Sequence, residues 1–557
     1  MNAPGELTDY ARMDGPFADG LLIPQISELA EKYDIDGVWV DGDCWATQLD
    51  YHPETIAKFQ ARTGIDLKGN PPKNEADPYY REYVDYHRDL FRAYLKHYVD
   101  ALHKKYPKLQ ICSNWAFSHF MPEGLCADMD FLSGDLTPND CVNSARHCGR
   151  MFARHDLPWD LMSWDFRLGV YGTFLHAHKH ITQLLQESAA VISLGGGYQA
   201  YAMQFPDGSH DVNRLLQMAP LTEFMRKREA FCAHGKPIPQ AALMVSTQDR
   251  YADLKLPFSD GTRDRLFGIT SLLCDSGISL ETLCDHNLDK LDRYPLLVIP
   301  ELGIEPAPEL VDQWKRYAQN GGSLLLVGAK TAQYLAPHFG FTAEKFIEDD
   351  KESAFENMNN GHEVAAINES APCYFSMNGK EFGVSKGAYT IDAGAQAREF
   401  GRVYETFRDS GKPFAQIFPF GRGQVGVIGI DLGSQYNTEM QHHHRILIRT
   451  MADALYTPLA RVDRVKGILE LTCLEKDGKF MLQLSNMGGA HNNRRSICED
   501  YIPEIRDAQL SIAADKPIKK LILQPEGKEL PFTLEDGRYR FAVDCIEIHN
   551  VVEVQYE

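Results

Sequence analysis

The chain has 557 residues and a formal net charge of −21, with 78 acidic side chains against 57 basic ones. This negative charge repels nucleic-acid phosphates and anionic lipid, so we expect neither nucleic acid nor a membrane as a partner. The apolar content of 44% is typical of a packed globular protein. The length predicts two to four domains, and no apolar run reaches the roughly 18 to 20 residues that span a bilayer.

Residues 1–20 have neither a basic start nor an apolar segment, so the sequence predicts no secretory signal peptide. The twelve cysteines include no CxxC pair, and several lie in apolar segments, as Cys112, Cys274 and Cys284 do. This distribution is typical of reduced thiols in a core. We therefore expect a cytoplasmic protein, or one whose leading segment is missing from this chain.

The first 235 residues alternate between helical and strand-like segments. This alternation predicts a parallel sheet with crossover helices, and therefore a TIM barrel of the (β/α)8 type over residues 1–235. Five strands are expected where a complete barrel has eight, so we expect the first two or three units to be absent from this chain. Eight closed strands here would contradict that expectation. The helices are predicted at 21–33, 78–106 and 173–190, and the strands at 38–41, 109–112, 130–132, 161–164 and 191–194.

Two prolines and a glycine in HGKPIPQ (234–240) mark a domain boundary. Residues 236–457 predict an open, doubly wound α/β domain of the flavodoxin type, with an irregular stretch at 340–420. Residues 458–557 carry short alternating segments and an Asp-Gly turn, which predict antiparallel hairpins and a β-sandwich. In the α/β domain the later strands are expected at 296–301, 320–329 and 423–431, and the helices at 262–275, 307–319 and 441–455.

Polar and aromatic residues gather where the predicted barrel strands end. These ends meet at one mouth of a parallel barrel, so their side chains are candidates for a site. Five of the six tryptophans lie before residue 165, and carbohydrate sites use indole faces together with Asp, Asn and His. Burial in the core is the alternative for any single tryptophan. The candidates for substrate binding are Trp39, Asp43, Trp45, Asn114, Trp115, His119, Trp164 and Tyr198.

Hydrolysis of a glycoside needs two carboxyl groups in different protonation states. Asp41 is the candidate nucleophile or base, and its alternative is a helix cap or a salt bridge to a loop. Asp135, Asp160 and Asp165 compete for the role of proton donor.

Four segments resemble α-L-fucosidases, over roughly the first 210 residues. DGVWVDGDCW (36–45) is similar to that family's strand end, D-x-x-W-x-D-G followed by an acidic or small residue and Trp, and the resemblance implies that Asp41 is the nucleophile. DFLSGDLTP (130–138) resembles the region of the acid/base glutamate, with Asp135 in its place. LGGGYQAYAMQFPDGS (194–209) resembles the family's Gly-Asn-Leu-Leu-Leu-Asn-x-x-Pro-x-x-Asp-Gly strand and turn. PWDLMSW (158–164) resembles the family's Trp-Glu segment, with Asp160 for Glu.

The later parts resemble another architecture, that of β-galactosidases in which a barrel is followed by a glutamine-amidotransferase-like α/β domain and a small β domain. LLLVGAKTAQ (324–333) contains no Gly-x-Cys-x-Gly or Gly-x-Ser-x-Gly elbow, so we expect the amidotransferase-like domain to lack a catalytic nucleophile. In the related galactosidases this domain builds oligomer contacts. The resemblance therefore implies a homo-oligomer, for example a trimer.

Neither a metal nor a cofactor is predicted. The three histidines of QHHHR (441–445) lie about 100° apart around a helix and cannot all face one ion. HAHKH (176–180) is interpreted as the polar face of a helix that could begin near the barrel mouth. No phosphate loop of the Walker or GxGxxG kind precedes a helix.

The leading hypothesis is a retaining exo-glycosidase that removes terminal α-L-fucose from oligosaccharides or glycoconjugates. Three alternatives remain open at this point. They are a β-galactosidase-like or other glycosidase on the same architecture, a carbohydrate-binding protein without activity, and a structural oligomerisation protein.

Overall fold

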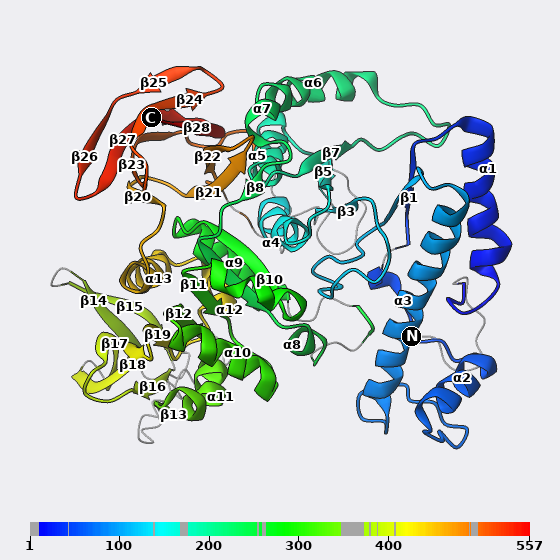
Figure 1. The fold of residues 1–557 in the computed structure, drawn as a ribbon, viewed down its shortest axis with the longest axis horizontal. Helices are drawn as coiled ribbons and strands as arrows, with labels where there is room; N and C mark the ends of the chain where they lie inside the picture. Colours follow the sequence, from blue (N-terminus) through cyan, green and yellow to red (C-terminus); the bar gives the residue numbers. More distant parts are fainter. Residues whose placement is uncertain are drawn as a thin grey trace, which may run out of the picture.

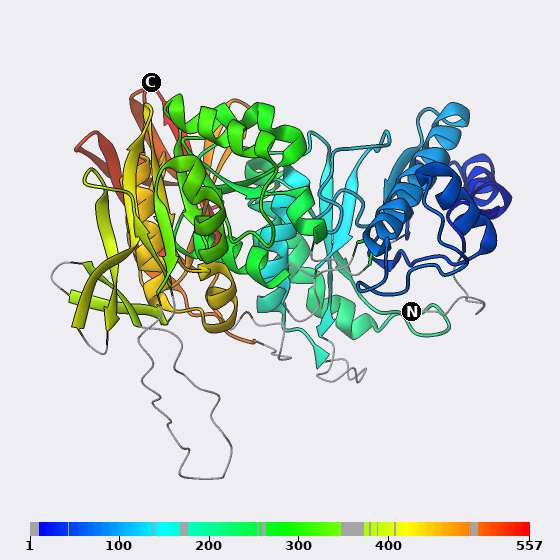
Figure 2. The same ribbon diagram turned by 90° about the horizontal axis from the view of Figure 1, so that it is seen from below.

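The computed structural model describes residues 11–42, 44–136, 140–167, 177–252, 256–258, 263–346, 372–377, 380–386, 388–405, 408–489, 491 and 499–557. Figures 1 and 2 show the N-terminal elements at one end of the molecule, and the middle and C-terminal parts beside each other at the other end. In the described part of the chain, no helix is both long and apolar enough to cross a membrane.

The N-terminal part contains five parallel strands. β1 pairs with β2, and β4 pairs with β3 and β7. Backbone hydrogen bonds from Asp130 to Ile111 and from Trp115 to Ser133 join β2 to β3. The elements are η1 (Ala18–Leu22), α1 (Ile23–Tyr33), β1 (Gly37–Val40), η2 (Cys44–Ala46), α2 (Pro53–Thr63), α3 (Tyr80–Lys105), β2 (Gln110–Ser113), β3 (Leu132–Asp135), α4 (Cys141–Ala153), β4 (Trp159–Trp164), β5 (Phe166–Arg167), β6 (Ala177–His178), α5 (Ile181–Ile192), β7 (Gly197–Tyr201), α6 (Val212–Arg226) and α7 (Glu229–Cys232).

Two expectations about this part are wrong. The segment 191–194 is not a strand, because Val191 and Ile192 complete the buried face of α5, and the strand follows Gly195, whose φ of +87° turns the chain. The segment HAHKH is not a helix in its described residues, because β6 covers Ala177–His178. The side chain of His180 caps the N-terminus of α5 by accepting a hydrogen bond from Thr182 N.

β1 is more exposed than its apolar sequence predicts. Trp39 retains 38% of its accessible surface and only Val40 is buried. Among the described residues β1 pairs with β2 alone, so it is an edge strand with one open side. The side chains at its end therefore remain accessible.

The middle part contains a nine-stranded sheet in the order β10-β9-β11-β12-β19-β18-β17-β14-β15. Its first five strands are parallel, in the doubly wound pattern that the sequence predicts. The elements are β9 (Ala241–Val245), α8 (Thr247–Ala252), α9 (Arg263–Asp275), β10 (Leu280–Cys284), η4 (Asp285–Arg293), β11 (Leu296–Ile299), α10 (Pro308–Gln319), β12 (Ser323–Val327), α11 (Ala329–Phe339), β13 (Thr342–Lys345), β14 (Pro372–Met377), β15 (Lys380–Lys386), β16 (Tyr389–Asp392), β17 (Arg398–Glu405), β18 (Arg408–Phe420), β19 (Gly423–Ile428), α12 (Leu432–Glu439) and α13 (His442–Leu455).

The stretch 340–420 is not irregular where the structure describes it, because β13 to β18 lie there. The register between β17 and β18 shifts at three places. Bulges of this kind interrupt the alternation of apolar and polar residues by which a strand is predicted. Residues 347–371 lie outside the described part.

The C-terminal part consists of two antiparallel sheets that enclose one apolar core. The short strand β8 joins the larger sheet by pairing with β21, although it precedes the middle part in the chain. The strands are β8 (Lys236–Pro237), β20 (Ala460–Arg464), β21 (Leu469–Lys476), β22 (Lys479–Asn486), β23 (Ile505–Ala513), β24 (Ile518–Gln524), β25 (Lys528–Leu530), β26 (Phe532–Glu535), β27 (Arg538–Ile546) and β28 (His549–Tyr556).

A buried group of charges ties the three parts together. Arg146 of α4 binds Glu470 of β21 at 2.6 Å and Asp275 of α9 at 2.7 Å. Arg150 of α4 binds the other oxygen of Glu470 at 2.7 Å. All four side chains are at most 1% exposed, so the pairing, rather than solvent, neutralises these charges.

Candidate active site

Four side chains form a connected row at the carboxyl ends of neighbouring strands. Asp41 follows β1, Asn114 follows β2, Asp135 ends β3 and Trp164 ends β4. The amide nitrogen Nδ2 of Asn114 donates to Asp41 Oδ1 at 3.2 Å and to Asp135 Oδ2 at 3.3 Å. The indole nitrogen of Trp164 donates to Asp135 Oδ1 at 3.2 Å. The structure thus brings these four side chains together at the strand ends.

The two carboxylates are close enough to act on one bond. One nitrogen binds both, so the two acceptor oxygens lie within about 6.5 Å of each other. Retaining glycosidases hold their carboxyls about 5 to 5.5 Å apart, and inverting ones about 6.5 to 9.5 Å apart. This bound favours the retaining geometry.

Asp135 and Asp41 have different environments. Burial raises the pKa of Asp135, the negative charge of Asp41 raises it further, and hydrogen bonds from Trp164 and Asn114 oppose the rise. Asp41 is exposed to solvent. A carboxyl group of raised pKa beside a solvent-exposed one is the kind of difference that glycoside hydrolysis uses.

Asp160 does not belong to this row. It pairs in register with Ser133, two residues before Asp135, which places it about 7 Å lower along the sheet. Its carboxylate accepts hydrogen bonds from Ser133 Oγ at 2.5 Å and from Gln199 Nε2 at 2.8 Å. Asp165, the third candidate donor, is held by Arg214 at 2.6 Å. Of the three candidates, only Asp135 lies beside Asp41.

Exposed aromatic side chains lie along the same end of the sheet. Trp39 shares the face of β1 with Asp41, because side chains alternate along a strand, and Trp45 of η2 is 45% exposed. The ring of Trp164 contacts that of Tyr201 at the end of β7. The sequence did not point to Tyr201, because the strand was placed before the glycines instead of after them. Asp43 lies outside the described residues.

Two predicted pocket residues, Tyr198 and His119, lie elsewhere, and a third, Trp115, is buried beside Asp135. Tyr198 points to the helix side of β7, because it alternates with Gln199, which bonds Asp160 on the other face. Trp115 is buried against Gly134 of β3, where a Cβ would come within 2.8 Å of its ring. His119 is buried among aromatic rings, including that of Phe267.

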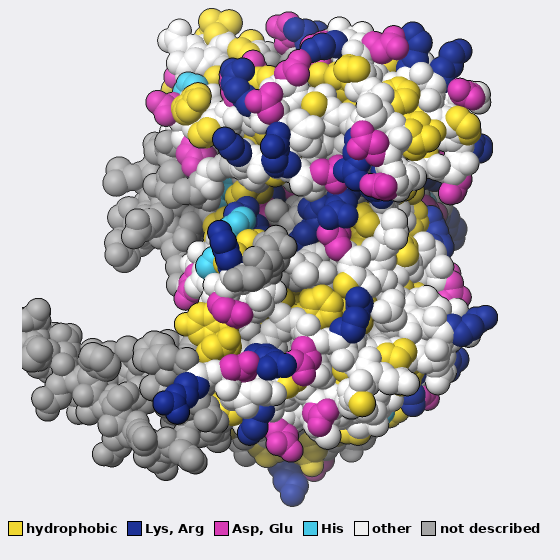
Figure 3. Space-filling view, turned by 90° about the vertical axis from the view of Figure 1, so that its left-hand side faces the viewer, with side chains coloured by type: hydrophobic (Ala, Val, Ile, Leu, Met, Phe, Trp, Pro, Cys, Tyr) yellow, Lys and Arg dark blue, Asp and Glu magenta, His cyan; other side chains and the backbone are white. Residues whose placement is uncertain are grey.

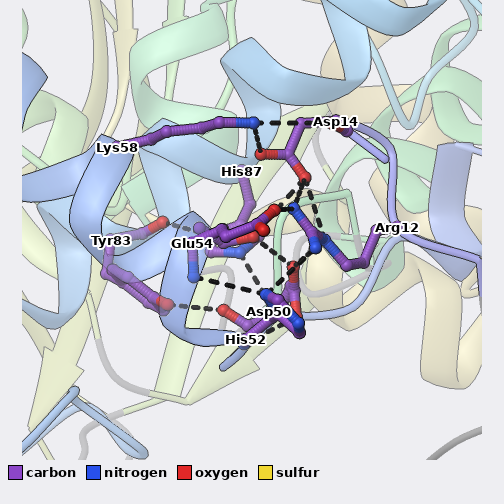
Figure 4. Close-up of polar contacts among 9 residues, drawn as sticks. Arg12, Asp14, Asp50, His52, Glu54, Lys58, Tyr83 and His87 are labelled. Carbon is purple, nitrogen blue, oxygen red and sulfur yellow. Dashed lines mark hydrogen bonds and ion pairs between the residues drawn. The ribbon is translucent and has the colours of Figure 1, made fainter. Parts of the chain in front are cut away.

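The loop that carries Trp45 is anchored by a polar cluster (Figure 4). Asp50 N donates to Nε2 of the buried His87 at 2.8 Å, and Tyr83 donates to the carbonyl oxygen of Asp50. Burial lowers the pKa of His87, so the ring stays neutral and accepts this bond. Arg12, Asp14, Glu54 and Lys58 surround the loop with ion pairs. The cluster fixes η2 relative to α3.

Comparison with known proteins gives similarity in fold only. A scan of protein-family models and a search of curated proteins both find no match. Among solved structures, the alpha-L-fucosidase isoenzyme 2 from Paenibacillus thiaminolyticus matches with a TM-score of 0.74 and 16% identity, over 98% of this chain and 81% of that one. A catalytic mutant of Gan42B, a GH42 beta-galactosidase from G. stearothermophilus, matches with a TM-score of 0.64 and 14% identity, over 98% and 83%.

The beta-galactosidase from Bacillus circulans sp. alkalophilus gives a TM-score of 0.63 and 12% identity, over 96% of this chain and 81% of that one. These matches extend through the N-terminal, middle and C-terminal parts alike. The chain has a glycoside-hydrolase fold.

Within this glycoside-hydrolase fold, the middle part carries no nucleophile at the strand-to-helix elbow that the sequence singles out. Gly328 stands between β12 and α11, which begins at Ala329, and the carboxylate of Glu301 accepts hydrogen bonds there from the backbone N–H groups of Lys330 and Thr331. A Cβ on Gly328 would lie 2.1 Å from that carboxylate, so glycine is required at this position. The carboxylate of Glu301 therefore occupies the turn between β12 and α11.

Metal ligands do not cluster in the described residues. Two histidines of QHHHR bind backbone carbonyls instead, His443 at Gly383 O (2.8 Å) and His444 at Val384 O (2.7 Å). On the face in Figure 3, acidic and basic side chains are interspersed over the middle and C-terminal parts. This face carries no single field of positive charge of the kind that nucleic-acid phosphates require.

Proposed function

We propose that the protein is a retaining glycoside hydrolase with Asp41 as nucleophile and Asp135 as acid and base. The observation that carries this proposal is the single amide of Asn114 that binds both carboxylates. It holds an exposed acid and a half-buried acid of raised pKa within reach of one glycosidic bond. The glycoside-hydrolase fold supports the assignment but does not carry it.

In this mechanism an oxygen of Asp41 attacks the anomeric carbon while Asp135 gives its proton to the departing oxygen. The C–O bond of the glycoside breaks, and a covalent ester between the sugar and Asp41 forms. Asp135, now ionised, takes a proton from water, whose oxygen attacks the same carbon and releases Asp41. Asn114 donates to both carboxylates and keeps them aligned through the two steps.

Terminal α-L-fucose is the proposed substrate. Its support is the similarity of DGVWVDGDCW to fucosidase strand ends and the match to a solved fucosidase. In the proposed complex the exposed faces of Trp39 and Trp45 pack on the ring and the methyl group of the sugar. A β-galactoside is the second candidate, because solved β-galactosidases also match the whole fold. Turnover of a panel of nitrophenyl glycosides separates the two.

The variant Asp41→Asn tests the mechanism. It is expected to lower turnover of the best nitrophenyl glycoside by at least about 10³-fold, because an amide oxygen is a poor nucleophile, and to leave the melting temperature unchanged. Asp36→Asn, which changes an exposed aspartate just before the other end of β1, is the matched control and is expected to keep full turnover. Wild-type turnover in Asp41→Asn would exclude the proposal.

Self-association is a separate proposal, supported by the resemblance of the middle part to the oligomer-forming domain of galactosidases. Light scattering at micromolar concentration tests it. A monomeric mass would contradict it.

A further inference from the structure

A cavity of about 580 Å³ lies at the opposite end of the first sheet from Asp41 and Asp135. One wall is formed where β3, β4 and β7 begin, and includes Trp159 and Asp160. The facing wall belongs to the middle part and includes Lys290 of η4. Cavities of about 300 to 1,000 Å³ between domains are where proteins commonly bind small molecules.

The indole of Trp159 packs against two glycines beside this cavity. A Cβ on Gly196 would lie 2.3 Å from its ring, and one on Gly149 would lie 3.2 Å from it. Two glycines on different elements therefore make room for one ring, which is half-buried and lines the cavity. A rigid indole face is a stacking surface for the C–H side of a sugar ring.

Polar groups of both kinds line the same cavity, although the side chain of Asp160 points to the opposite face of β4 from Trp159. The carboxylate of Asp160 is oriented by Ser133 and Gln199 and keeps lone pairs for further donors. Across the cavity the ammonium of Lys290 lies 3.6 Å from Asp156. His155 also lines the cavity, and burial together with Arg154 lowers its pKa to about 2, so its ring is neutral. The wall thus offers an acceptor, a donor and an uncharged ring.

The backbone of this wall favours hydroxyl donors over anions. Helices α4 and α5 both end here, with Arg154 and Ser193 as their C-caps. The last carbonyl groups of a helix carry a partial negative charge, which repels anions and accepts hydrogen bonds from hydroxyl groups. An indole with mixed polar groups beside two helix C-termini matches a neutral polyhydroxylated ligand.

We propose that this cavity is a second carbohydrate-binding site, which takes a neutral mono- or disaccharide without cleaving it. Asp160 and Trp164 are four residue steps apart on β4, so the two sites lie about 13 Å apart along the strand. The site does not depend on Asp41, and it stands whether or not the proposed hydrolase activity is found.

Isothermal titration calorimetry of the full chain tests the proposal, with L-fucose, D-galactose, D-glucose and lactose as the probes. The titrations use Asp41→Asn as background, so that turnover does not obscure the heat of binding. Saturable binding of at least one sugar is expected. Trp159→Phe and, separately, Lys290→Ala are each expected to weaken that binding by about three- to tenfold, because each removes one contact.

Two controls keep the result decisive. Lys104→Ala, an exposed lysine of α3, is expected to leave binding unchanged, and melting temperatures verify that each variant folds. Absence of binding for every probe overturns the proposal. Binding that neither Trp159→Phe nor Lys290→Ala weakens also overturns it, and so does binding that is lost in Trp39→Phe. Turnover of nitrophenyl glycosides, measured with Asp41 restored, reports separately on the hydrolase proposal.

Discussion

The first sheet and the middle sheet both end their parallel strands in acids, yet they treat them in opposite ways. In the first sheet, Asp41 and Asp135 share one amide donor and no backbone N–H group binds either of them among the hydrogen bonds described. In the middle sheet, Asp249 accepts from Gly303 N and Ile304 N, and Glu301 accepts from Lys330 N and Thr331 N.

This difference explains why one sheet has a candidate active site and the other does not. Ligands of doubly wound folds bind outside the carboxyl ends of the strands, where the strand order reverses. That point lies between β9 and β11, and Asp249 occupies it with its own carboxylate, paired to Arg265 at 2.6 Å. A carboxylate is available for chemistry where backbone N–H groups do not already occupy its oxygens with hydrogen bonds.

The largest expected effect is on the acid of the first sheet. Asp135→Asn is expected to lower turnover by about 10²- to 10⁴-fold for a glycoside with a poor leaving group, because such a group needs a proton. For a dinitrophenyl glycoside the loss should be much smaller, since that group leaves unprotonated. Because burial raises the pKa of Asp135, wild-type turnover falls as pH rises through this pKa, and the variant should lose that limb. Equal losses for both substrates would contradict the role.

The middle sheet is expected to give the reverse result. Asp249→Ala removes the acceptor of Gly303 N and Ile304 N and the ion pair to Arg265, and should lower the free energy of unfolding by about 3 to 5 kcal/mol. Turnover at a temperature where the variant is folded should not change. Urea denaturation measures the loss of stability, and a nitrophenyl glycoside assay measures turnover. Loss of turnover in a folded sample would contradict the assignment of a purely structural role to Asp249.

One acid of the middle sheet is poorly compensated and sharpens the comparison. Burial raises the pKa of Glu281 to about 7, although Tyr294 donates to it at 2.9 Å. The folded state then binds more protons than the unfolded state between about pH 4.5 and 7, so stability falls as pH rises through this range. Glu281→Gln should stabilise the protein by up to about 3 kcal/mol at pH 8 and by little at pH 4. Thermal denaturation at both pH values measures this, and equal effects would refute it.

The smallest expected effect concerns the donor to Asp135. Trp164→Phe removes an N–H group that stabilises the ionised carboxylate, so the pKa of Asp135 should rise further. The alkaline limb of the pH profile should move upward by up to about one pH unit. A limb that moves downward, or stays in place, would show that this bond does not control the proton.

The sequence predicted that acids meet at the strand ends, but not which of them do so. Convergence of parallel strand ends pointed to Asp41, and it left Asp135, Asp160 and Asp165 as competing partners. Asp160 is excluded by its position along the strand, because it pairs with Ser133 and not with Asp135. Tyr198 is excluded by its face, since a shift of one residue turns a side chain to the opposite face. Placing the last strand before the glycines instead of at β7 therefore misassigned Tyr198 and hid Tyr201.

Contacts between residues far apart in the chain also could not be predicted from the sequence. The sequence shows no reason for Trp115 to pack on Gly134 or for His119 to enter an aromatic cluster, because those partners are distant in the chain or belong to another part of the fold. The amide that joins the two carboxylates was predicted only as a substrate contact. Its bridging role depends on the spacing of three strands, which composition does not reveal.

The charges of Arg146 and Arg150 have a consequence for anyone who wishes to trim this molecule. A fragment that ends before β21 would leave two guanidinium groups inside the core without Glu470. Excising a minimal catalytic piece therefore requires replacing these arginines by apolar residues of similar volume. The same constraint would accompany any exchange of the terminal β module between related chains.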